Sequence, residues 1–272
     1  MPASPMRSQL FCLLSSQRSG STWLADMLQS HPDVRMYGEV FLDRRPPETI
    51  KPAIRHLYTS NNYYNFRTTR AVPRPFTAWA YLRGLKQTSE AARVGFKLMN
   101  DQLRALPEIW PAIVAYRSPV LYLKRRNALD IVVSHEARFQ QGRAHSGRGE
   151  TNSAPARVHI DTGTLVARLA RQQKIVRRME RLLWASPVPS LSIVYEDLKD
   201  DREGVLSGVA NFLGLSRIPA AKDGGTLRRV NPGSYEDKIS NYDEVSALLQ
   251  STPYSHYLLD EGEGPVGPLS AR

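Results

Sequence analysis

The fold of this chain is decided by residues 9–28, QLFCLLSSQRSGSTWLADML. An apolar run of strand length fills residues 9–15, and a loop of small polar residues with one glycine follows it. Four apolar side chains then recur at helical spacing: Trp23, Leu24, Met27 and Leu28. The stretch therefore predicts a buried strand, a glycine-bearing loop and a helix.

Strand and helix patterns alternate along the rest of the chain. Strand-length apolar runs fill 94–99, 120–123 and 191–195, and helical patterns fill 128–140, 161–184 and 205–213. Helices between such strands require right-handed crossovers, which give a parallel sheet covered by helices on both faces. We therefore predict a three-layer α/β/α fold with a central parallel sheet, in a single domain over residues 1–272. Ligands of such sheets bind beyond the carboxyl ends of the strands.

Two segments interrupt this alternation. Residues 46–88 contain several prolines and the polar, aromatic cluster NNYYNF at 61–66, so we expect an irregular insertion that binds the substrate or acts as a lid. Residues 142–157 are rich in glycine, serine, arginine and asparagine, which predicts a mobile surface loop.

The composition limits the class of partner. The formal net charge is +11, from 37 basic and 26 acidic residues, which favours nucleic acid, a membrane surface or an anionic small molecule. The basic residues are scattered without a block of five or more. The aromatic residues, 8% of the chain, do not alternate with them as in a base-stacking platform, so nucleic acid is the less favoured partner. The charge indicates an anionic partner without naming it.

The sequence also bears on the compartment. No stretch approaches the length of about 20 apolar residues that spans a bilayer. The single cysteine, Cys12, lies in the first apolar run and can form no internal disulfide, which suits a reducing compartment. We therefore expect a cytoplasmic protein, and the sequence leaves its oligomeric state open.

The segment at residues 17–23 has the chemistry of an oxyanion site. The start of a helix offers unpaired backbone N–H groups and the positive end of a dipole. Gly20 permits close approach of the backbone, neighbouring hydroxyl groups donate hydrogen bonds, and Arg18 adds a forked positive charge. An ordinary capped turn is the alternative interpretation.

A nucleoside-triphosphate P-loop is a different pattern. It requires Gly-x-x-x-x-Gly-Lys-Ser/Thr, whose lysine reaches the terminal phosphates and whose hydroxyl binds magnesium. Here the first glycine and the lysine are both absent, and no clear acidic magnesium ligand follows a later strand. The loop therefore suits an oxyanion but not ordinary ATP hydrolysis.

Residues 16–23, SQRSGSTW, resemble the 5′-phosphosulfate loop of the sulfotransferases that use 3′-phosphoadenosine 5′-phosphosulfate (PAPS). This form of the loop is frequent in bacterial and carbohydrate-directed members, among them the trehalose-sulfotransferase branch. The resemblance implies the fold of that family, a structural cousin of the P-loop kinases. It also implies that the donor is bound by Arg18, Ser19, Gly20, Ser21, Thr22 and Trp23.

A second motif, LYLKRRN at 121–127, resembles the segment of the same family that binds the 3′-phosphate. In that segment an arginine and a serine eight positions later grip the phosphate, and Arg126 and Ser134 have this separation. An arginine at a strand end and a serine two turns into the next helix can face one phosphate. Arg125 competes for the arginine role, and a solvated basic residue is the alternative for Arg126.

Two weaker similarities lie further along the chain. VYEDL at 194–198 resembles a strand end of the family, and residues 231–242 resemble the C-terminal segment that folds over the cofactor in many bacterial members. By that resemblance Arg228, Arg229 or Lys238 contacts the nucleotide, and the sequence does not choose among them.

The activity that the resemblance implies is sulfuryl transfer from PAPS to a hydroxyl or amine of a small molecule, glycan or glycolipid. The transfer is an in-line displacement that yields 3′-phosphoadenosine 5′-phosphate (PAP). It depends on positioning and on stabilising charge, here by Arg18 at the leaving phosphate. It requires no metal, and the sequence contains no compact His, Cys and Asp cluster to bind one.

An acceptor hydroxyl needs a base to take its proton. Glu39, in YGEVF at 37–41, resembles the glutamate proposed as base in the trehalose-sulfotransferase branch, and a surface or ion-paired glutamate is the alternative. Many cytosolic members use a histidine, for which His31 and His135 are the nearest candidates. Lys97, in GFKLM at 95–99, resembles a lysine that contacts acceptor or sulfonate, and it would be costly to bury unpaired.

Three other functions stay open at this point. The first is a P-loop-type small-molecule kinase, although the P-loop lysine is missing. The second is a nucleic-acid-binding protein, favoured by the isoelectric point of about 9.9 and the arginine-rich pattern at 168–181. The third is a non-catalytic member that only binds a nucleotide, and the presence of Glu39 argues against it. The sequence does not identify the acceptor.

Overall fold

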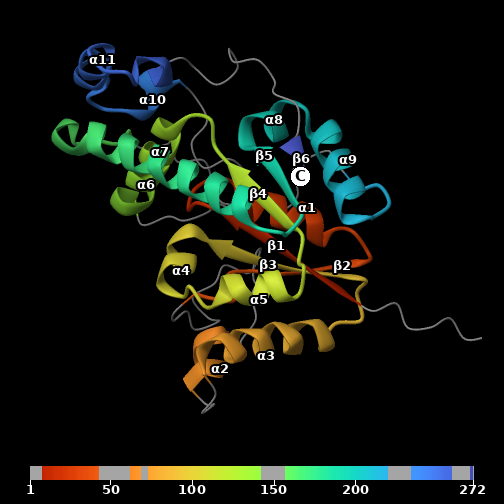
Figure 1. Ribbon diagram of the computed structural model, residues 1–272. Coiled ribbons are helices and arrows are strands. Elements are labelled where there is room, and N and C mark those ends of the chain that lie inside the picture. The colour runs from red at the N-terminus through yellow and green to blue at the C-terminus, as the bar shows by residue number, and fades with distance from the viewer. Residues whose placement is uncertain are drawn as a thin grey trace, which may run out of the picture.

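The computed structural model describes residues 8–42, 62–68, 73–141, 157–219, 234–258 and 270–271. Their strands form one six-stranded sheet in the order β2-β3-β1-β4-β5-β6 (Figure 1). Five of them run parallel: β1 (Gln9–Ser15), β2 (Val34–Tyr37), β3 (Arg93–Met99), β4 (Val120–Lys124) and β5 (Ser190–Val194). The short β6 (Ser270–Ala271) pairs antiparallel with β5. The predicted central parallel sheet is confirmed.

The central strand, β1, is buried on both faces. Leu10, Cys12 and Leu14 belong to one hydrophobic cluster, whereas Phe11 and Leu13 belong to another. The division arises because successive side chains of a strand point to opposite faces of the sheet. The continuous apolar run in the sequence therefore marks a strand covered on both sides.

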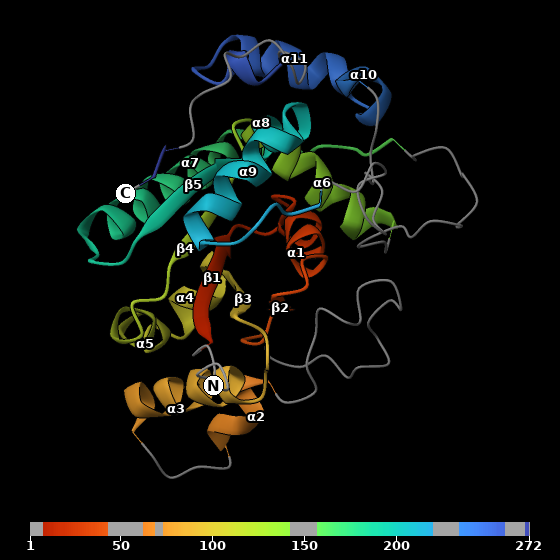
Figure 2. The same ribbon diagram turned by 90° about the vertical axis from the view of Figure 1, so that its right-hand side faces the viewer.

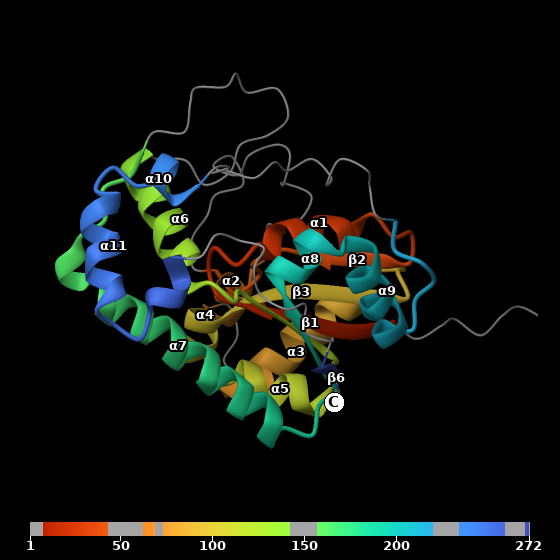
Figure 3. The ribbon, with the colours of Figure 1, turned by 90° about the horizontal axis from the view of Figure 1, so that it is seen from above.

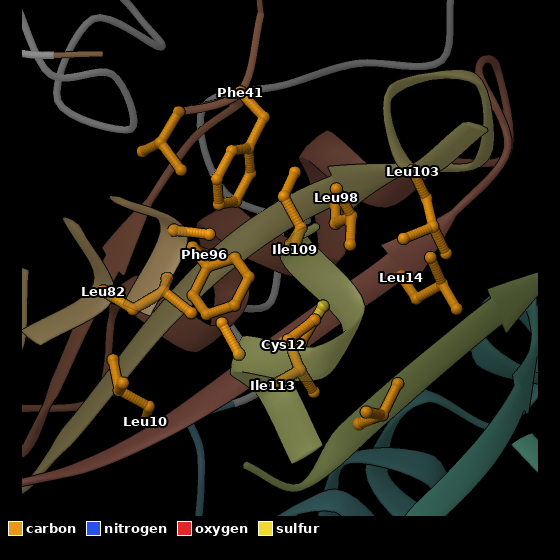
Figure 4. Close-up of a cluster of buried hydrophobic side chains, with 14 of the residues drawn as sticks. Leu10, Cys12, Leu14, Phe41, Leu82, Phe96, Leu98, Leu103, Ile109 and Ile113 are labelled. Atoms are coloured by element: carbon orange, nitrogen blue, oxygen red, sulfur yellow. The ribbon is translucent and has the colours of Figure 1, made fainter. Parts of the chain in front are cut away.

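Helices cover both faces of the sheet (Figure 2). The face of Phe11 and Leu13 is covered by α1 (Ser21–Gln29), α8 (Tyr195–Asp200) and α9 (Arg202–Leu213). The opposite face is covered by α3 (Arg74–Gln87), α5 (Ile109–Ala115) and the last turns of α7 (Thr162–Ala185). There Phe96 and Ile113 lie in one cluster with Cys12 (Figure 4). This is the predicted three-layer α/β/α fold.

A third hydrophobic cluster lies beside the sheet. It joins α7 to α6 (Ala128–Gln141), α10 (Tyr235–Lys238) and α11 (Tyr242–Gln250) (Figure 3). Two polar contacts secure it: the hydroxyl of Tyr235 donates to Asp130 Oδ1 at 3.0 Å, and Asn127 Nδ2 donates to the carbonyl oxygen of Tyr257 at 2.9 Å. Tyr257 lies in the 3-10 helix Ser255–Leu258. None of the helices within the described ranges is both long and apolar enough to cross a membrane.

The expectation of an irregular insertion at residues 46–88 is wrong for two parts of it. α2 (Tyr63–Thr68) and α3 are helical. Two of the prolines that suggested irregular structure begin α3, with Pro73 as its N-cap and Pro75 in its first turn. Proline fits there because the first N–H groups of a helix have no intrahelical partner. Residues 43–61 and 69–72 lie outside the described residues, as do 142–156 of the predicted mobile loop.

Burial of the one cysteine decides its chemistry. Cys12 is fully enclosed in β1, and this burial raises the pKa of its thiol. The thiol therefore stays protonated and does not act as a nucleophile.

We predict that Gly95→Ala destabilises the fold. A Cβ atom there would lie 2.2 Å from Phe11 Cζ and 2.5 Å from Met36 Sδ. Overpacking of this kind costs about 1–3 kcal/mol, so the thermal midpoint should fall by several degrees. Gly84→Ala is the matched control, because Gly84 lies in α3 with no atom within 4 Å of the new Cβ. This substitution should raise the free energy of unfolding by up to about 1 kcal/mol. Circular dichroism melting compares the two variants, and equal midpoints would contradict this packing.

Candidate active site

The loop between β1 and α1 has an unusual backbone. Arg18 has a φ of 64° and Gly20 a φ of 85°, both in the left-handed region. α1 begins at Ser21, and the N–H groups of Trp23 and Leu24 both donate to the Gly20 carbonyl oxygen, at 3.0 and 3.2 Å. Among the side chains that the structure describes, none caps this helix. The first N–H groups of α1 therefore suit an oxyanion.

One side of the loop is held by residues at the start of α4 (Asn100–Ala105), directly after β3. Asn100 Nδ2 donates to Ser16 Oγ at 2.8 Å, and Gln17 Nε2 donates to Asp101 Oδ2 at 3.0 Å. Ser19 is buried, and its hydroxyl donates to the Ser16 carbonyl oxygen at 2.7 Å. The Ser19 hydroxyl thus stabilises the loop itself, which leaves its backbone N–H as the group for a ligand.

Tyr195, directly after β5, covers the other side of the loop. A Cβ atom at Gly20 would lie 2.3 Å from Tyr195 Cδ2, so the contact requires glycine. The Tyr195 ring makes an edge contact with Trp23, with centroids 5.9 Å apart, and Arg125 lies 4.2 Å from its centroid. Arg202 lies 5.2 Å from the centroid of Trp23. Tyr195 therefore connects the loop to the ends of β4 and β5.

Lys97 brings three of the predicted site residues into contact. Its side chain is 1% exposed, and Nζ donates to Thr22 Oγ1 at 2.9 Å. The same Nζ lies 3.6 Å from Glu39 Oε1, and Glu39 is 20% exposed. Glu39 Oε2 accepts a hydrogen bond from Gln102 Nε2 at 3.2 Å. The loop, β3 and the segment after β2 thus share one polar network, as burial of an ammonium group requires.

The structure separates the two arginines that follow β4. Arg126 donates from Nη2 to Asp197 Oδ1 at 2.7 Å, and its side chain is 39% exposed. Arg125 is 10% exposed and lies 3.2 Å from Asp130 Oδ2. Arg125 is therefore committed to packing inside the fold, whereas Arg126 lies at the surface of the edge where a ligand would bind.

Ser134, on α6, connects the second motif to the loop. Its Oγ accepts from Arg18 Nε at 2.9 Å, a contact between residues 116 positions apart in the sequence. The two motifs that the sequence places far apart thus meet at one edge of the sheet. The grip of Arg126 and Ser134 on one phosphate stays a prediction.

The motif VYEDL has a structural role that the sequence did not specify. Glu196 is buried, and its carboxylate accepts from the backbone N–H groups of Arg126 and Asn127, at 2.9 and 3.4 Å. Asp197 pairs with the Arg126 side chain, and Tyr195 covers the loop. Three consecutive residues therefore fix the turn after β4 and the loop after β1.

Of the three basic residues proposed for the C-terminal segment, Arg228 and Arg229 lie outside the described residues. Lys238 is buried, and its Nζ lies 5.2 Å from the centroid of the Tyr235 ring. Since Tyr235 in turn donates to Asp130, Lys238 belongs to the packing of α10 against α6.

The histidine alternative to Glu39 has little support from His31. His31 is buried, with Nε2 2.8 Å from Ser216 Oγ, and its Nδ1 accepts from the Asp33 N–H at 3.1 Å. His31 lies between the end of α1 and the start of β2, near the amino ends of the parallel strands, whereas the loop lies at their carboxyl ends. His135 is exposed on α6. Within the described part of the chain, no group of three or more His, Cys, Asp or Glu residues could hold a metal ion.

Sequence reasoning missed the residues of α4 that contact the site, Asn100, Asp101 and Gln102. Their position was the available signal, because they directly follow a strand whose carboxyl end lies beside the loop.

The chain belongs to the sulfotransferase family, whose model matches residues 11–219. It is 22% identical over 259 residues to Nodulation protein H of Rhizobium meliloti (strain 1021), a match that covers 94% of this chain and 98% of that protein. It is similar to the solved sulfotransferase domain from the curacin biosynthetic pathway (20% identity, TM-score 0.47, 89% and 87% coverage). A mouse sulfotransferase complexed with PAP is also similar (14% identity, TM-score 0.42, 93% and 88% coverage).

Membership of this family makes the chain an enzyme that transfers a sulfuryl group from PAPS to an acceptor and releases PAP. The predicted family, activity and donor are confirmed over the kinase and the non-catalytic alternatives. Acceptors of the family are small molecules or glycans.

We predict that Gly20→Ala weakens the binding of PAP. The alanine would have to adopt a φ of 85°, at a cost of about 1–2 kcal/mol, while its Cβ collides with the Tyr195 ring. Either the loop or Tyr195 must move, so the dissociation constant from calorimetry should rise at least about tenfold. Gly84→Ala again serves as the control, and an unchanged PAP affinity in Gly20→Ala would show that the loop does not bind the nucleotide.

Proposed function

We propose that this sulfotransferase modifies a hydroxyl group of a small-molecule, carbohydrate or lipid-linked acceptor, with Glu39 as the base. The observation that carries the proposal is the network in which Glu39, Lys97 and Thr22 meet beside the loop. Lys97 is enclosed, whereas Glu39 keeps part of its carboxylate exposed, so Glu39 is the member that an acceptor can reach. An amine acceptor is the alternative outcome of an acceptor screen.

The hydrogen-bonding and positively charged groups of the site suit the binding of PAPS. PAPS supplies a sulfuryl group on a phosphate leaving group. The loop residues 18–23 would bind its 5′ end through N–H groups and Arg18, and Arg126 with Ser134 would bind the 3′-phosphate. Arg228 and Arg229 are proposed as further contacts to the nucleotide. Arg18 lies 2.9 Å from Ser134, which supports one continuous anion site.

Each charged residue has a proposed task in the transfer. Glu39 removes the proton of the acceptor hydroxyl. Lys97 keeps Glu39 and Thr22 in place and offers positive charge to the sulfonate oxygens, and Arg18 offsets charge on the leaving phosphate.

Residues 46–88 are proposed to bind the acceptor or to act as a lid. The described part of this insertion supports the idea, because the N–H of Tyr63 donates to the Val40 carbonyl oxygen at 2.8 Å, one residue after Glu39. The rings of Tyr63 and Phe41 also make an edge contact at 5.3 Å. α2 is thereby anchored beside the proposed base.

We propose that the chain forms one domain, supported by the sheet that residues from both of its ends share. We propose the cytoplasm as its compartment, supported by a single, buried cysteine.

We predict that Arg126→Ala weakens binding of PAP by about 10- to 100-fold, the loss expected for a charged hydrogen bond. Binding of adenosine 5′-phosphosulfate, which lacks the 3′-phosphate, should change much less. Calorimetry measures both ligands, with the exposed Arg104 on α4 replaced by alanine as the control. Equal losses for the two ligands would rule out this placement of the 3′-phosphate.

We predict that Glu39→Gln lowers kcat by about 10²- to 10⁴-fold, because the amide cannot accept the proton. The affinity for PAP should stay within about twofold. Turnover is followed with labelled donor and by the mass gain of the acceptor, in a screen of sugars, phenols and lipid-linked glycans. Glu203→Gln, which changes an exposed glutamate paired with Arg217, is the control. A Glu39→Gln enzyme with normal turnover would remove Glu39 from the mechanism.

A further inference from the structure

Gln102 is a buried side chain with two polar contacts, and both bear on the proposed base. It lies in the first turn of α4, and it is 6% exposed. Its Oε1 accepts from the backbone N–H of Met99 at 3.0 Å, and its Nε2 donates to Glu39 Oε2 at 3.2 Å. The side chain therefore bridges the end of β3 and the carboxylate of Glu39.

The contact to Met99 determines which way the amide points. The Met99 N–H is a buried backbone donor at the start of α4, and such a group needs an acceptor. Of the two ends of a glutamine amide, only the oxygen accepts. The reversed amide would set donor against donor at Met99 and oxygen against carboxylate at Glu39. Gln102 can therefore only donate to Glu39.

The carboxylate of Glu39 is thus held at both oxygens. Oε1 lies 3.6 Å from the Lys97 ammonium, and Oε2 accepts from Gln102. Lys97 is itself bound to Thr22, in the segment 17–23 that is proposed to bind PAPS and is called the donor loop below, so it cannot turn toward Glu39 without releasing Thr22. Gln102 is the contact that fixes the remaining rotation of the carboxylate, because it grips the oxygen that Lys97 does not.

We propose that Gln102 is a positioning residue for the sulfuryl transfer: it orients the Glu39 carboxylate toward the acceptor. The proposal rests on the role of Glu39 as base. Because Gln102 is buried and its amide is bonded to Met99 and Glu39, it acts through Glu39. A carboxylate free to rotate would spend less time in line with the acceptor hydroxyl, and small misplacements of this kind cost up to about 100-fold in rate.

The sharpest test is Gln102→Glu, which has nearly the same size. Glutamate keeps an oxygen for the Met99 N–H and replaces the donor that faces Glu39 with a second oxygen. We expect kcat to fall by about 10- to 100-fold. The affinity for PAP and the KM of the acceptor should stay within about twofold, since the buried side chain of Gln102 acts through Glu39. Gln102→Met, which is neutral, tests the same loss if the glutamate variant does not fold.

A reciprocal exchange separates positioning from folding. The double variant Glu39→Gln with Gln102→Glu restores a hydrogen bond of reversed polarity, because the new amide can donate to the new carboxylate. Its thermal midpoint should recover from that of the Gln102→Glu single variant toward the original protein. Its turnover should stay at the level of Glu39→Gln, since the base is still missing from position 39.

The outcomes distinguish this inference from the proposed function. Normal turnover in a folded Gln102→Glu or Gln102→Met enzyme, with Glu39→Gln inactive, would overturn the positioning role and leave Glu39 as the base. Normal turnover in Glu39→Gln would overturn the base itself. A tenfold rise in the PAP dissociation constant of Gln102→Met would show that Gln102 supports the donor loop instead, and would also overturn the inference.

Discussion

The ammonium group of Lys97 lies almost entirely out of water at the carboxyl edge of the sheet, and this burial constrains everything around it. An unpaired charge in that position would cost several kcal/mol, so the fold must bring polar partners to it. One partner, Thr22, comes from α1, and another, Glu39, comes from the segment after β2. The same contacts that neutralise the charge place the donor loop beside the proposed base. The contacts that stabilise the fold around Lys97 are thus the ones that assemble the site. They hold the reacting groups in fixed positions, on which this kind of reaction depends.

The donor loop is held from both sides of β1. α4, after β3, reaches it through Asn100 and Ser16, and Tyr195, after β5, packs on Gly20. β3 and β4 are the two strands that flank β1, and β5 lies beyond β4. Tyr195 therefore spans one strand to reach the loop, and the same segment fixes the turn after β4 through Glu196. Tyr195 and Glu196 thus support both segments that are proposed to bind the nucleotide: the donor loop and the turn after β4.

Sequence patterns predicted the strands β1, β3, β4 and β5 and the helices α1, α6, α7 and α9, because these segments carry clear apolar runs or helical periodicities. The shorter helices α2, α4, α5, α8 and α10 were not predicted, because a few residues are too short to show a helical period. Glu39, Lys97 and Thr22 could be selected one at a time, by resemblance. Their meeting could not be predicted, since it depends on which way a strand residue points and how far a side chain reaches. Gln102 was missed because a single glutamine in a short helix belongs to no sequence motif or periodic pattern. β2 was missed because four residues with Arg35 among them form no apolar run. α3 was missed because its prolines suggested irregular structure, although at the start of a helix proline removes no intrahelical hydrogen bond.

Cys12 offers a practical consequence of the core. It is the only cysteine of the chain, it is enclosed between two layers of helices, and its thiol stays protonated. Maleimides and other thiol reagents should therefore leave the native protein unmodified. A cysteine introduced at an exposed site, for example in place of Arg104 on α4, would be the sole point of attachment. Fluorophores and spin labels could then be attached at that one position without any prior removal of native thiols.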